Sequence, residues 1–225
     1  MNGETKCVFV IAMEKEALPL LKFIDIEEDY SYCAKHVISG KLFNRPVSVV
    51  ICGVGKVNAG CGAQIAVDLL KADTVVNLGV AGGLNSGLKI GEIYAISEVV
   101  QYDFDLTQLN GTEIGTLDEC DKNYLPLTLL NTSFMAKRCA TGDRFNDSKD
   151  DYSLLTQTLK ADVRDMELGA IAQTCMHAGV KCLAFKIISD LAGSGSTTEQ
   201  YLKNLTQCFT TLERNLKELT DKIYG

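Results

Sequence analysis

A carboxylate follows directly on an apolar run near the C-terminal end of the chain. Residues 182–188 are almost continuously apolar, and the run stops at Ser189 and Asp190. A solvated turn or a helix cap would use the same residue types. In open α/β sheets, however, ligands bind at the carboxyl ends of strands, so an acid at such an end is a candidate for proton transfer.

Two glutamates stand in comparable positions. Glu16 lies just beyond an apolar run at residues 7–12, and Glu167 opens a helical pattern over residues 167–178. Each alone is also typical of a first-turn helix carboxylate or of a solvated helix face. If a sheet brings both glutamates together with Asp190, three carboxylates line one cleft. That arrangement favours acid/base chemistry on a bond that breaks with cationic character.

The glycines give a weaker signal. A Gly-Val-Gly sequence at residues 53–55 matches the start of a dinucleotide fingerprint, but Asn58 stands where the third glycine is needed. The segment 79–83 carries three glycines, which suit tight turns and also the close approach of a ligand to the backbone. Phe145 fits a core position and an aromatic platform for a flat ligand equally well.

The elements that must position these side chains follow from hydrophobic periodicity. Short apolar, β-branched runs predict strands buried on both faces, at residues 7–12, 47–52, 74–78, 92–100 and 182–188. Amphipathic patterns predict helices at residues 14–23, 57–70, 167–178 and 197–223. The alternation predicts an α/β fold, a single three-layer αβα domain over residues 1–225 with a central mixed, mostly parallel sheet. The stretch 101–130 is less regular and is expected to form a surface excursion.

Composition excludes several classes of function. The net charge is −7 and no lysine/arginine cluster occurs, so nucleic acid and anionic membranes are not expected partners. Nine cysteines without a CxxC pair suit reduced core residues of a cytoplasmic protein, and two isolated histidines give little support for a metal site. The N-terminal segment lacks a basic region and its apolar run breaks at Glu14, so neither a signal peptide nor a membrane span is expected there.

Six motifs occur in order along the chain: AMEKEALPLL, GVGKVNAG, NLGVAGGLNSGLKIGEIY, ATGDRF, DVRDMELGAIAQTC and KIISDLA. They resemble the AMxxE, G-[IV]-GKVxAA, NxGxAGGLxxxLKxGDI, SGDxF, AVEMEAxAIAxVC and RxISDxA elements of the 5′-methylthioadenosine/S-adenosylhomocysteine nucleosidases, within the purine and uridine nucleoside phosphorylase family. One motif would be weak, but six across residues 8–202 are a strong signal. The resemblance implies a nucleoside phosphorylase-like fold. It also implies hydrolysis of the N-glycosidic bond of these adenine nucleosides, which releases adenine and the thioribose.

By position, the resemblance assigns a catalytic pair. Glu16 is implied to be the general base that activates the attacking water. Asp190 is implied to be the general acid that protonates adenine N7, with Ser189 orienting it. An acid must be protonated when it acts, so apolar neighbours such as Ile188 are expected to raise the pKa of Asp190. Departure of adenine leaves an oxocarbenium-like sugar, whose positive charge carboxylates stabilise.

The resemblance also implies the substrate-binding residues. Glu167 would bind the ribose hydroxyls, Met166 would lie against the apolar face of the sugar, and Phe145 would stack on adenine. The other members of the set are Ala81 and Gly82 on the ribose side, the Asn146 backbone at the edge of the base, Asp165 in the ribose segment, and Ser189.

The chain departs from the family pattern at several of these positions. Asp165 stands where the family usually has Glu, Lys186 replaces the usual Arg, and Asn146 replaces an aliphatic residue. The segment 193–198 is smaller and more polar than the family's. These departures leave the glycosidase interpretation in place, and they leave open the 5′ substituent and the exact base.

Two other functions stay open at this point. A purine nucleoside phosphorylase shares the fold but must bind a phosphate dianion, which Glu16 near the reacting carbon would repel. A non-catalytic nucleoside-binding module would use the same glycine-rich cleft with the acid and base idle. The resemblance implies no metal or organic cofactor. It also implies a homodimer in which the segment 103–117 covers the neighbouring subunit's pocket for the 5′ substituent.

Overall fold

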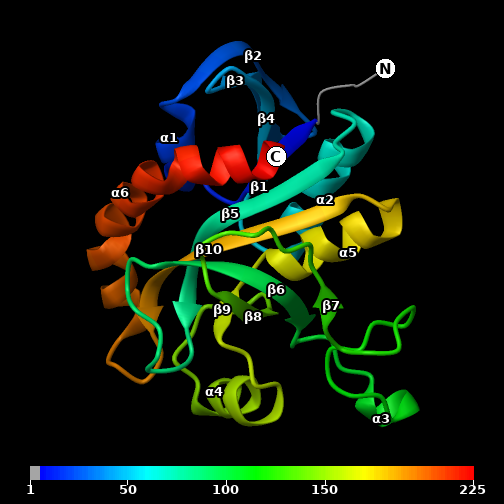
Figure 1. Ribbon diagram of the computed structural model, residues 1–225. Helices are drawn as coiled ribbons and strands as arrows, with labels where there is room; N and C mark the ends of the chain where they lie inside the picture. Colours follow the sequence, from blue (N-terminus) through cyan, green and yellow to red (C-terminus); the bar gives the residue numbers. More distant parts are fainter. Residues whose placement is uncertain (1–5) are drawn as a thin grey trace.

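The computed structural model describes residues 6–225 and is built around one mixed β-sheet (Figure 1). Its strands are β1 (Cys7–Ile11), β2 (Ile24–Tyr32), β3 (Lys35–Leu42), β4 (Arg45–Ile51), β5 (Thr74–Gly83), β6 (Ile93–Gln101), β7 (Leu125–Pro126), β8 (Ala136–Thr141), β9 (Val163–Asp165) and β10 (Lys181–Leu191). They follow the order β10-β6-β8-β9-β5-β1-β4-β3-β2, and β7 pairs with β6.

Parallel pairing holds the middle of the sheet together. Strand β1 lies parallel to β4 and β5, and β5 lies parallel to β10. Antiparallel pairs add β2 and β3 at one edge, and they join β9 to β5 and β6 to β10. Because β10 pairs with both β5 and β6, part of the sheet closes on itself. The predicted mixed α/β sheet is confirmed, and this closure is a feature that the sequence did not indicate.

Helices cover both faces of the sheet. They are α1 (Glu14–Leu21), α2 (Lys56–Asp68), α3 (Thr107–Asn110), α4 (Lys149–Ser153), a π-helical turn (Leu154–Thr158), α5 (Leu168–Ala178) and α6 (Thr197–Tyr224). Helices α2 and α5 pack against each other on one face, and α1 and α6 pack against each other on the opposite face (Figure 1). This arrangement gives the predicted three layers.

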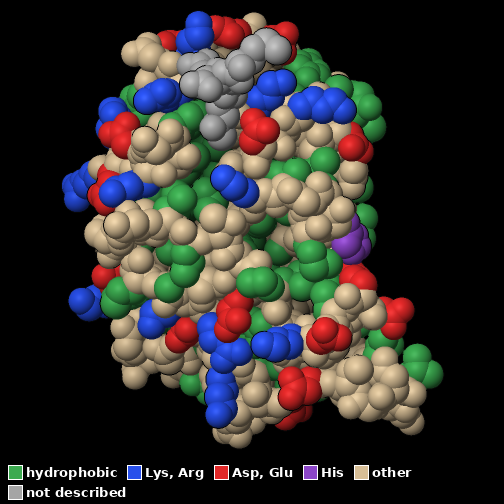
Figure 2. Space-filling view, turned by 45° about the vertical axis from the view of Figure 1, so that its right-hand side comes forward, with side chains coloured by type: hydrophobic (Ala, Val, Ile, Leu, Met, Phe, Trp, Pro, Cys, Tyr) green, Lys and Arg blue, Asp and Glu red, His purple; other side chains and the backbone are tan. Residues whose placement is uncertain are grey.

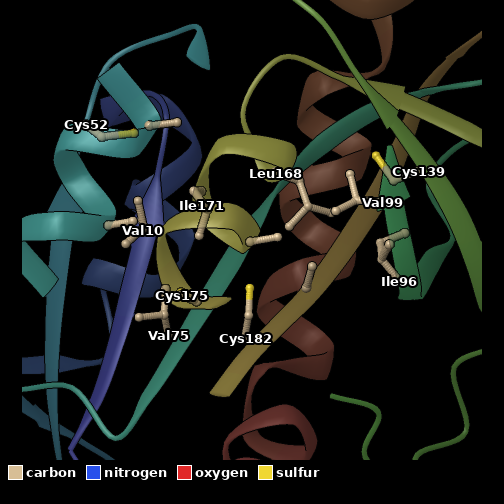
Figure 3. Close-up of a cluster of buried hydrophobic side chains, with 14 of the residues drawn as sticks. Val10, Cys52, Val75, Ile96, Val99, Cys139, Leu168, Ile171, Cys175 and Cys182 are labelled. Carbon is tan, nitrogen blue, oxygen red and sulfur yellow. The ribbon is translucent and has the colours of Figure 1, made fainter. Parts of the chain in front are cut away.

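Two apolar clusters fill the spaces between these layers. One joins α2 and α5 to the sheet, and Figure 3 shows Val10 and Val75 of the sheet facing Ile171 of α5, with Leu168 and Cys182 nearby. The other joins α1 and α6 to the opposite face of the same strands. Because the central strands bury both faces, their sequences read as continuous apolar runs instead of alternating ones.

The predicted strands and helices exist, but two strands are longer than predicted. Strand β5 continues to Gly83 and β10 continues to Leu191, whereas the sequence predicted ends at residues 78 and 188. Glycine weakens a strand signal, and an acid in an apolar run looks like its end. Parallel pairing between the two strands overrides both signals, so Asp190 lies within a strand and not after it.

Several elements gave no recognisable sequence signal. Strand β2 is largely exposed and polar, and β8 and β9 are short, so none of them forms an apolar run. The stretch 101–130 is irregular as predicted and contains only α3 and β7. It is not purely a surface excursion, since Tyr102 and Leu117 are buried.

The surface is mixed in charge. Figure 2 shows acidic and basic side chains interspersed over the face that it draws. Among residues 6–225, none of the helices combines the length and the apolar character that crossing a membrane requires.

The packing of α2 on the sheet generates a first prediction. A Cβ atom added at Gly62 would lie 2.5 Å from Cys52 Cβ, whereas one added at Gly60 on the same helix meets nothing closer than Thr174 Oγ1 at 3.9 Å. We expect Gly62→Ala to lower the free energy of unfolding by about 1–3 kcal/mol because the helix must move away from the sheet. Gly60→Ala is the matched control. It should raise the free energy of unfolding by ~0.5–1 kcal/mol, because alanine loses less conformational entropy than glycine on folding. Equal effects in urea denaturation would contradict this packing.

Candidate active site

A cavity of about 400 Å³ opens where β1, β5, β9 and β10 meet the start of α6. Nine of the ten predicted site residues line it: Glu16, Ala81, Gly82, Phe145, Asp165, Met166, Glu167, Ser189 and Asp190. The tenth, Asn146, does not, because its side-chain amide donates to Asp151 Oδ2 at 2.9 Å. The structure therefore brings together side chains that lie up to 174 positions apart in the sequence.

Glu16 enters the cavity from the first turn of α1 and is buried there. Its Oε1 accepts a hydrogen bond from the backbone N–H of Val80 at 3.0 Å. A Cβ atom at Gly79 would lie only 3.2 Å from the same oxygen, so the glycine lets the carboxylate approach the end of β5. Burial raises the pKa of Glu16, while the hydrogen bond from Val80 and the charge of Lys186 act in the opposite direction.

Asp190 reaches the cavity from the last part of β10. The register of β10 against β5 shifts between Ile188 and Asp190, so the strand is locally irregular where the acid is placed. Ser189 Oγ donates to Asp190 Oδ1 at 2.7 Å, whereas Oδ2 is buried and makes no hydrogen bond with any described residue. Burial raises the pKa of Asp190, and Ser189 and the charge of Arg164 partly oppose this shift.

A buried ion pair lies beneath the carboxylates. Lys186 Nζ is 2.7 Å from Asp165 Oδ2, and the two side chains are 2% and 1% exposed. Asp165 also accepts from Thr141 Oγ1 at 2.5 Å and from the backbone N–H of Leu168 at 3.0 Å. Burial alone would lower the pKa of Lys186, but the charges of Asp165 and Glu167 outweigh it and raise the pKa. Because its oxygens are engaged in these contacts, Asp165 supports the site from below and has little capacity left to bind a ligand.

Glu167 stands at the N-cap of α5, on the wall of the cavity. Its Oε1 accepts from the backbone N–H of Gly55 at 2.9 Å, and Gly55 has φ of +94°, which favours glycine. The glycine-rich segment 53–55 thus holds a carboxylate instead of a phosphate. Burial and, to a smaller extent, the nearby charge of Asp165 raise the pKa of Glu167 to about 7. The charge of Lys186 acts in the opposite direction.

An aromatic pair forms the outer wall of the cavity. The ring centroids of Phe145 and Tyr201 are 5.8 Å apart, with an angle of 69° between the planes. Lys15 Nζ lies 4.8 Å from the centroid of the Tyr201 ring. Phe145 is half exposed, so a flat ligand has access to this wall.

Other residues of the wall were missed by the sequence analysis. They are Ala12, Met13, Val54, Val80, Arg144, Arg164, Thr198, Tyr201 and Leu202. Tyr201 belongs to an amphipathic helix, whose pattern does not reveal that its first turns cover a pocket. Arg164 could have been noticed as a charge inside the segment that ends in Met166 and Glu167.

Within residues 6–225, no group of three or more His, Cys, Asp or Glu side chains is arranged to hold a metal ion. The chemistry that this site supports directly is proton transfer, because two buried carboxyl groups with raised pKa values face one cavity. Gly79 and Gly82, near the end of β5, let these two carboxyl groups lie close to the strand.

The model of the phosphorylase superfamily matches residues 6–224. A 5′-methylthioadenosine/S-adenosylhomocysteine nucleosidase of Exiguobacterium sp. (strain ATCC BAA-1283 / AT1b) is 32% identical over 194 residues, which cover 80% of this chain and 83% of that protein. The chain belongs to this nucleosidase family, within the phosphorylase superfamily. The family that the six motifs resemble is thereby confirmed.

Solved structures agree with this assignment. The nucleosidase of Colwellia psychrerythraea 34H, determined in complex with adenine, is 28% identical with a TM-score of 0.83, and the match covers 93% of this chain and 91% of that one. Futalosine hydrolase of Helicobacter pylori strain 26695 superposes with a TM-score of 0.88 at 24% identity, covering 97% and 98% of the two chains. At that identity the second likeness shows the shared fold alone.

The environment of Glu167 generates a second prediction. Its pKa is about 7 in the folded protein against an ordinary 4.5, so folding favours the protonated form. This contribution to stability is fully present below about pH 4.5 and is lost as the pH rises through 7. We expect Glu167→Gln to remove this loss, so the stability of the variant relative to the wild type should rise between pH 5 and pH 8.

Urea denaturation at several pH values measures this difference. Glu28→Gln on the exposed strand β2 controls for the loss of one negative charge. A stability difference between Glu167→Gln and the wild type that does not change with pH would show that Glu167 is ionised in the folded protein throughout this range.

Proposed function

We propose that this chain hydrolyses the N-glycosidic bond of adenine nucleosides with a 5′-thio substituent, such as 5′-methylthioadenosine and S-adenosylhomocysteine. The products are adenine and the thioribose. The observation that carries the proposal is a pair of buried carboxyl groups that lie beside the end of β5. Glu16 of α1 lies against Gly79, and Asp190 of β10 lies against Gly82. The nucleosidase relatives support the same reaction.

In the proposed reaction the two carboxyl groups act on opposite sides of the scissile bond. Gly79 and Gly82 are three residues apart, about 10 Å along an extended strand, which leaves room between the groups for the sugar and its bond to the base. Glu16 takes a proton from water as the water oxygen bonds to C1′. Asp190 gives its proton to N7 as the bond from C1′ to N9 breaks, so adenine leaves as a neutral base.

The remaining walls suit the other parts of the substrate. Glu167 accepts hydrogen bonds from the ribose hydroxyls with Met166 beside the sugar, and Ala81 and Gly82 let the nucleoside approach the backbone. Phe145 offers its face to the base. Asp165 acts through Lys186 instead of touching the substrate, and for Asn146 only the backbone remains available at the edge of the base.

Charge favours water over phosphate as the nucleophile. Lys186 is buried, and its charge lowers the pKa of Glu16. It is already paired with Asp165. Arg144 pairs with Asp151 at 3.0 Å, and Arg164 lies at the Asp190 end of the cavity, beside Gly82. The other cation that acts on Glu16 is Lys15, which lies over the ring of Tyr201. A dianion near Glu16 would therefore meet a carboxylate directly.

We also propose that the protein acts in the cytoplasm as a homodimer. The nine cysteines are all unpaired, which fits a reducing compartment. Val57 on α2 and Leu109 on α3 are 80% and 79% exposed, and α3 projects from the body of the molecule (Figure 1). Large apolar side chains in such positions suit a subunit interface.

The choice of nucleophile gives a third prediction. Adenine release from 5′-methylthioadenosine should proceed at an undiminished rate in buffer freed of phosphate, with free methylthioribose as the sugar product. A coupled assay for adenine and chromatography of the sugar measure both. Strict dependence on phosphate, with a sugar 1-phosphate as product, would establish the phosphorylase instead. Binding without turnover in either buffer would establish a binding module.

The catalytic pair gives a fourth prediction. Asp190→Asn keeps the shape but cannot deliver a proton, and Glu16→Gln cannot accept one. Each should lower kcat by ~10²-fold or more while 5′-methylthioadenosine still binds. Exposed Glu28→Gln is the control for a carboxamide exchange outside the site. Near-normal kcat in the Asp190 variant would mean that this residue has only a structural role.

A further inference from the structure

Arg164 is a buried cation whose side chain has no ion-pair partner in the described part of the chain. It lies on the short strand β9, lines the cavity and is 8% exposed. Among residues 6–225, no carboxylate is within ion-pair distance of its guanidinium, and its buried Nη2 makes no hydrogen bond. A buried charged donor left unsatisfied costs more than a neutral one, so such a group requires an explanation.

The neighbouring carboxylates do not supply the missing partner. Asp151 is engaged by Arg144 and by the amide of Asn146. Asp147 Oδ2 accepts from the backbone N–H of Thr197 at 3.4 Å. Asp190 is close enough for its pKa to respond to Arg164, yet the two are not paired.

The free groups of Arg164 and Asp190 converge on one point of the cavity. A Cβ atom placed on Gly82 would lie 2.9 Å from Asp190 Oδ2 and 3.2 Å from Arg164 Nε. Gly82 lines the cavity together with both residues, so the two groups flank a stretch of backbone that a ligand can approach. A ligand there meets the carboxyl group of Asp190 and, beside it, a guanidinium that can only donate.

The chemistry of purines decides what this pair of groups recognises. If Asp190 faces N7, the substituent at position 6 lies next to it, because both belong to the same edge of the base. Adenine presents an amino donor at position 6, whereas guanine and hypoxanthine present an oxygen acceptor, and arginine is the side chain that typically pairs with the O6 and N7 acceptors. A donor-only group at this place therefore suits a 6-oxopurine better than adenine.

We propose that the base site also accepts 6-oxopurine nucleosides, with Arg164 donating a hydrogen bond to O6 while Asp190 serves N7. The proposal rests on the proposed function, since it assumes the same cavity and the same orientation of the base. The reaction is the same hydrolysis. Water adds to C1′ and loses a proton to Glu16, the bond to N9 breaks, and the proton of Asp190 moves to N7, so hypoxanthine and the free sugar are released. Exchange with solvent then removes the proton from Glu16 and restores one to Asp190, which completes the cycle.

The test compares two substrates that differ only at the base, 5′-methylthioadenosine and 5′-methylthioinosine. The wild type should hydrolyse both. Arg164→Met keeps much of the apolar stem but removes the donors. It should lower kcat/KM for methylthioinosine by roughly 10- to 100-fold, with no comparable loss for methylthioadenosine. Arg144→Met is the matched variant, because Arg144 lines the same cavity but is paired with Asp151. It should leave the ratio of the two kcat/KM values unchanged.

Binding of the free bases gives a second measurement that does not depend on turnover. Calorimetric titration should show that hypoxanthine binds to the wild type and that Arg164→Met weakens hypoxanthine more than adenine. If the variant does not fold, hypoxanthine binding and methylthioinosine turnover by the wild type still show whether the site accepts a 6-oxopurine.

Each failure has its own signature. A wild type that hydrolyses methylthioadenosine but neither cleaves methylthioinosine nor binds hypoxanthine overturns the role of Arg164 and leaves the proposed function standing. Equal losses for both substrates in Arg164→Met also overturn it, because they show a structural role. A wild type that hydrolyses neither nucleoside removes the proposed function and this inference with it.

Discussion

The site depends on how the fold tolerates several carboxyl groups in one buried place. Glu16, Glu167 and Asp165 all lie where water is largely excluded, and like charges at such positions oppose ionisation. The structure places one fully buried cation, Lys186, against Asp165, where it also lowers the pKa values of Glu16 and Glu167. Without this cation the carboxylates would have to stay protonated or separate. The ion pair is therefore the constraint on which the remaining geometry rests.

Close backbone approach is the second requirement. Glu16 reaches the end of β5 because Gly79 has no side chain, and Asp190 and Arg164 converge where Gly82 has none. On the opposite wall, Gly55 adopts a positive φ and turns its N–H toward Glu167. In each case the missing side chain lets a charged side chain lie close to the backbone of the glycine. The glycines therefore position the carboxylates as well as leaving room for a ligand.

The two catalytic candidates differ in what surrounds them, and the difference is in keeping with the roles that we propose for them. Glu16 receives a backbone hydrogen bond and feels nearby positive charge, both of which favour the ionised form that a base needs. Asp190 has one oxygen without any hydrogen bond in a buried setting, which favours the protonated form that an acid needs. Burial raises the pKa of both groups, and the two differ in how many contacts oppose that shift by stabilising the ionised form.

The sequence by itself determined the α/β class, the main strands and helices, the family and nine of the residues that line the cavity. These follow from hydrophobic periodicity and from motifs, both of which are local in the chain. The tertiary structure decided the rest. Strands β5 and β10 extend past glycine and aspartate because each is paired along its length with the other, and a pairing partner more than 100 residues away leaves no local pattern. The same holds for Arg164. Arg164 is notable because its side chain has no ion-pair partner among residues 6–225 and because Asp190 lies near it. Only the pairing of both β9 and β10 with β5 brings the two residues to opposite sides of Gly82.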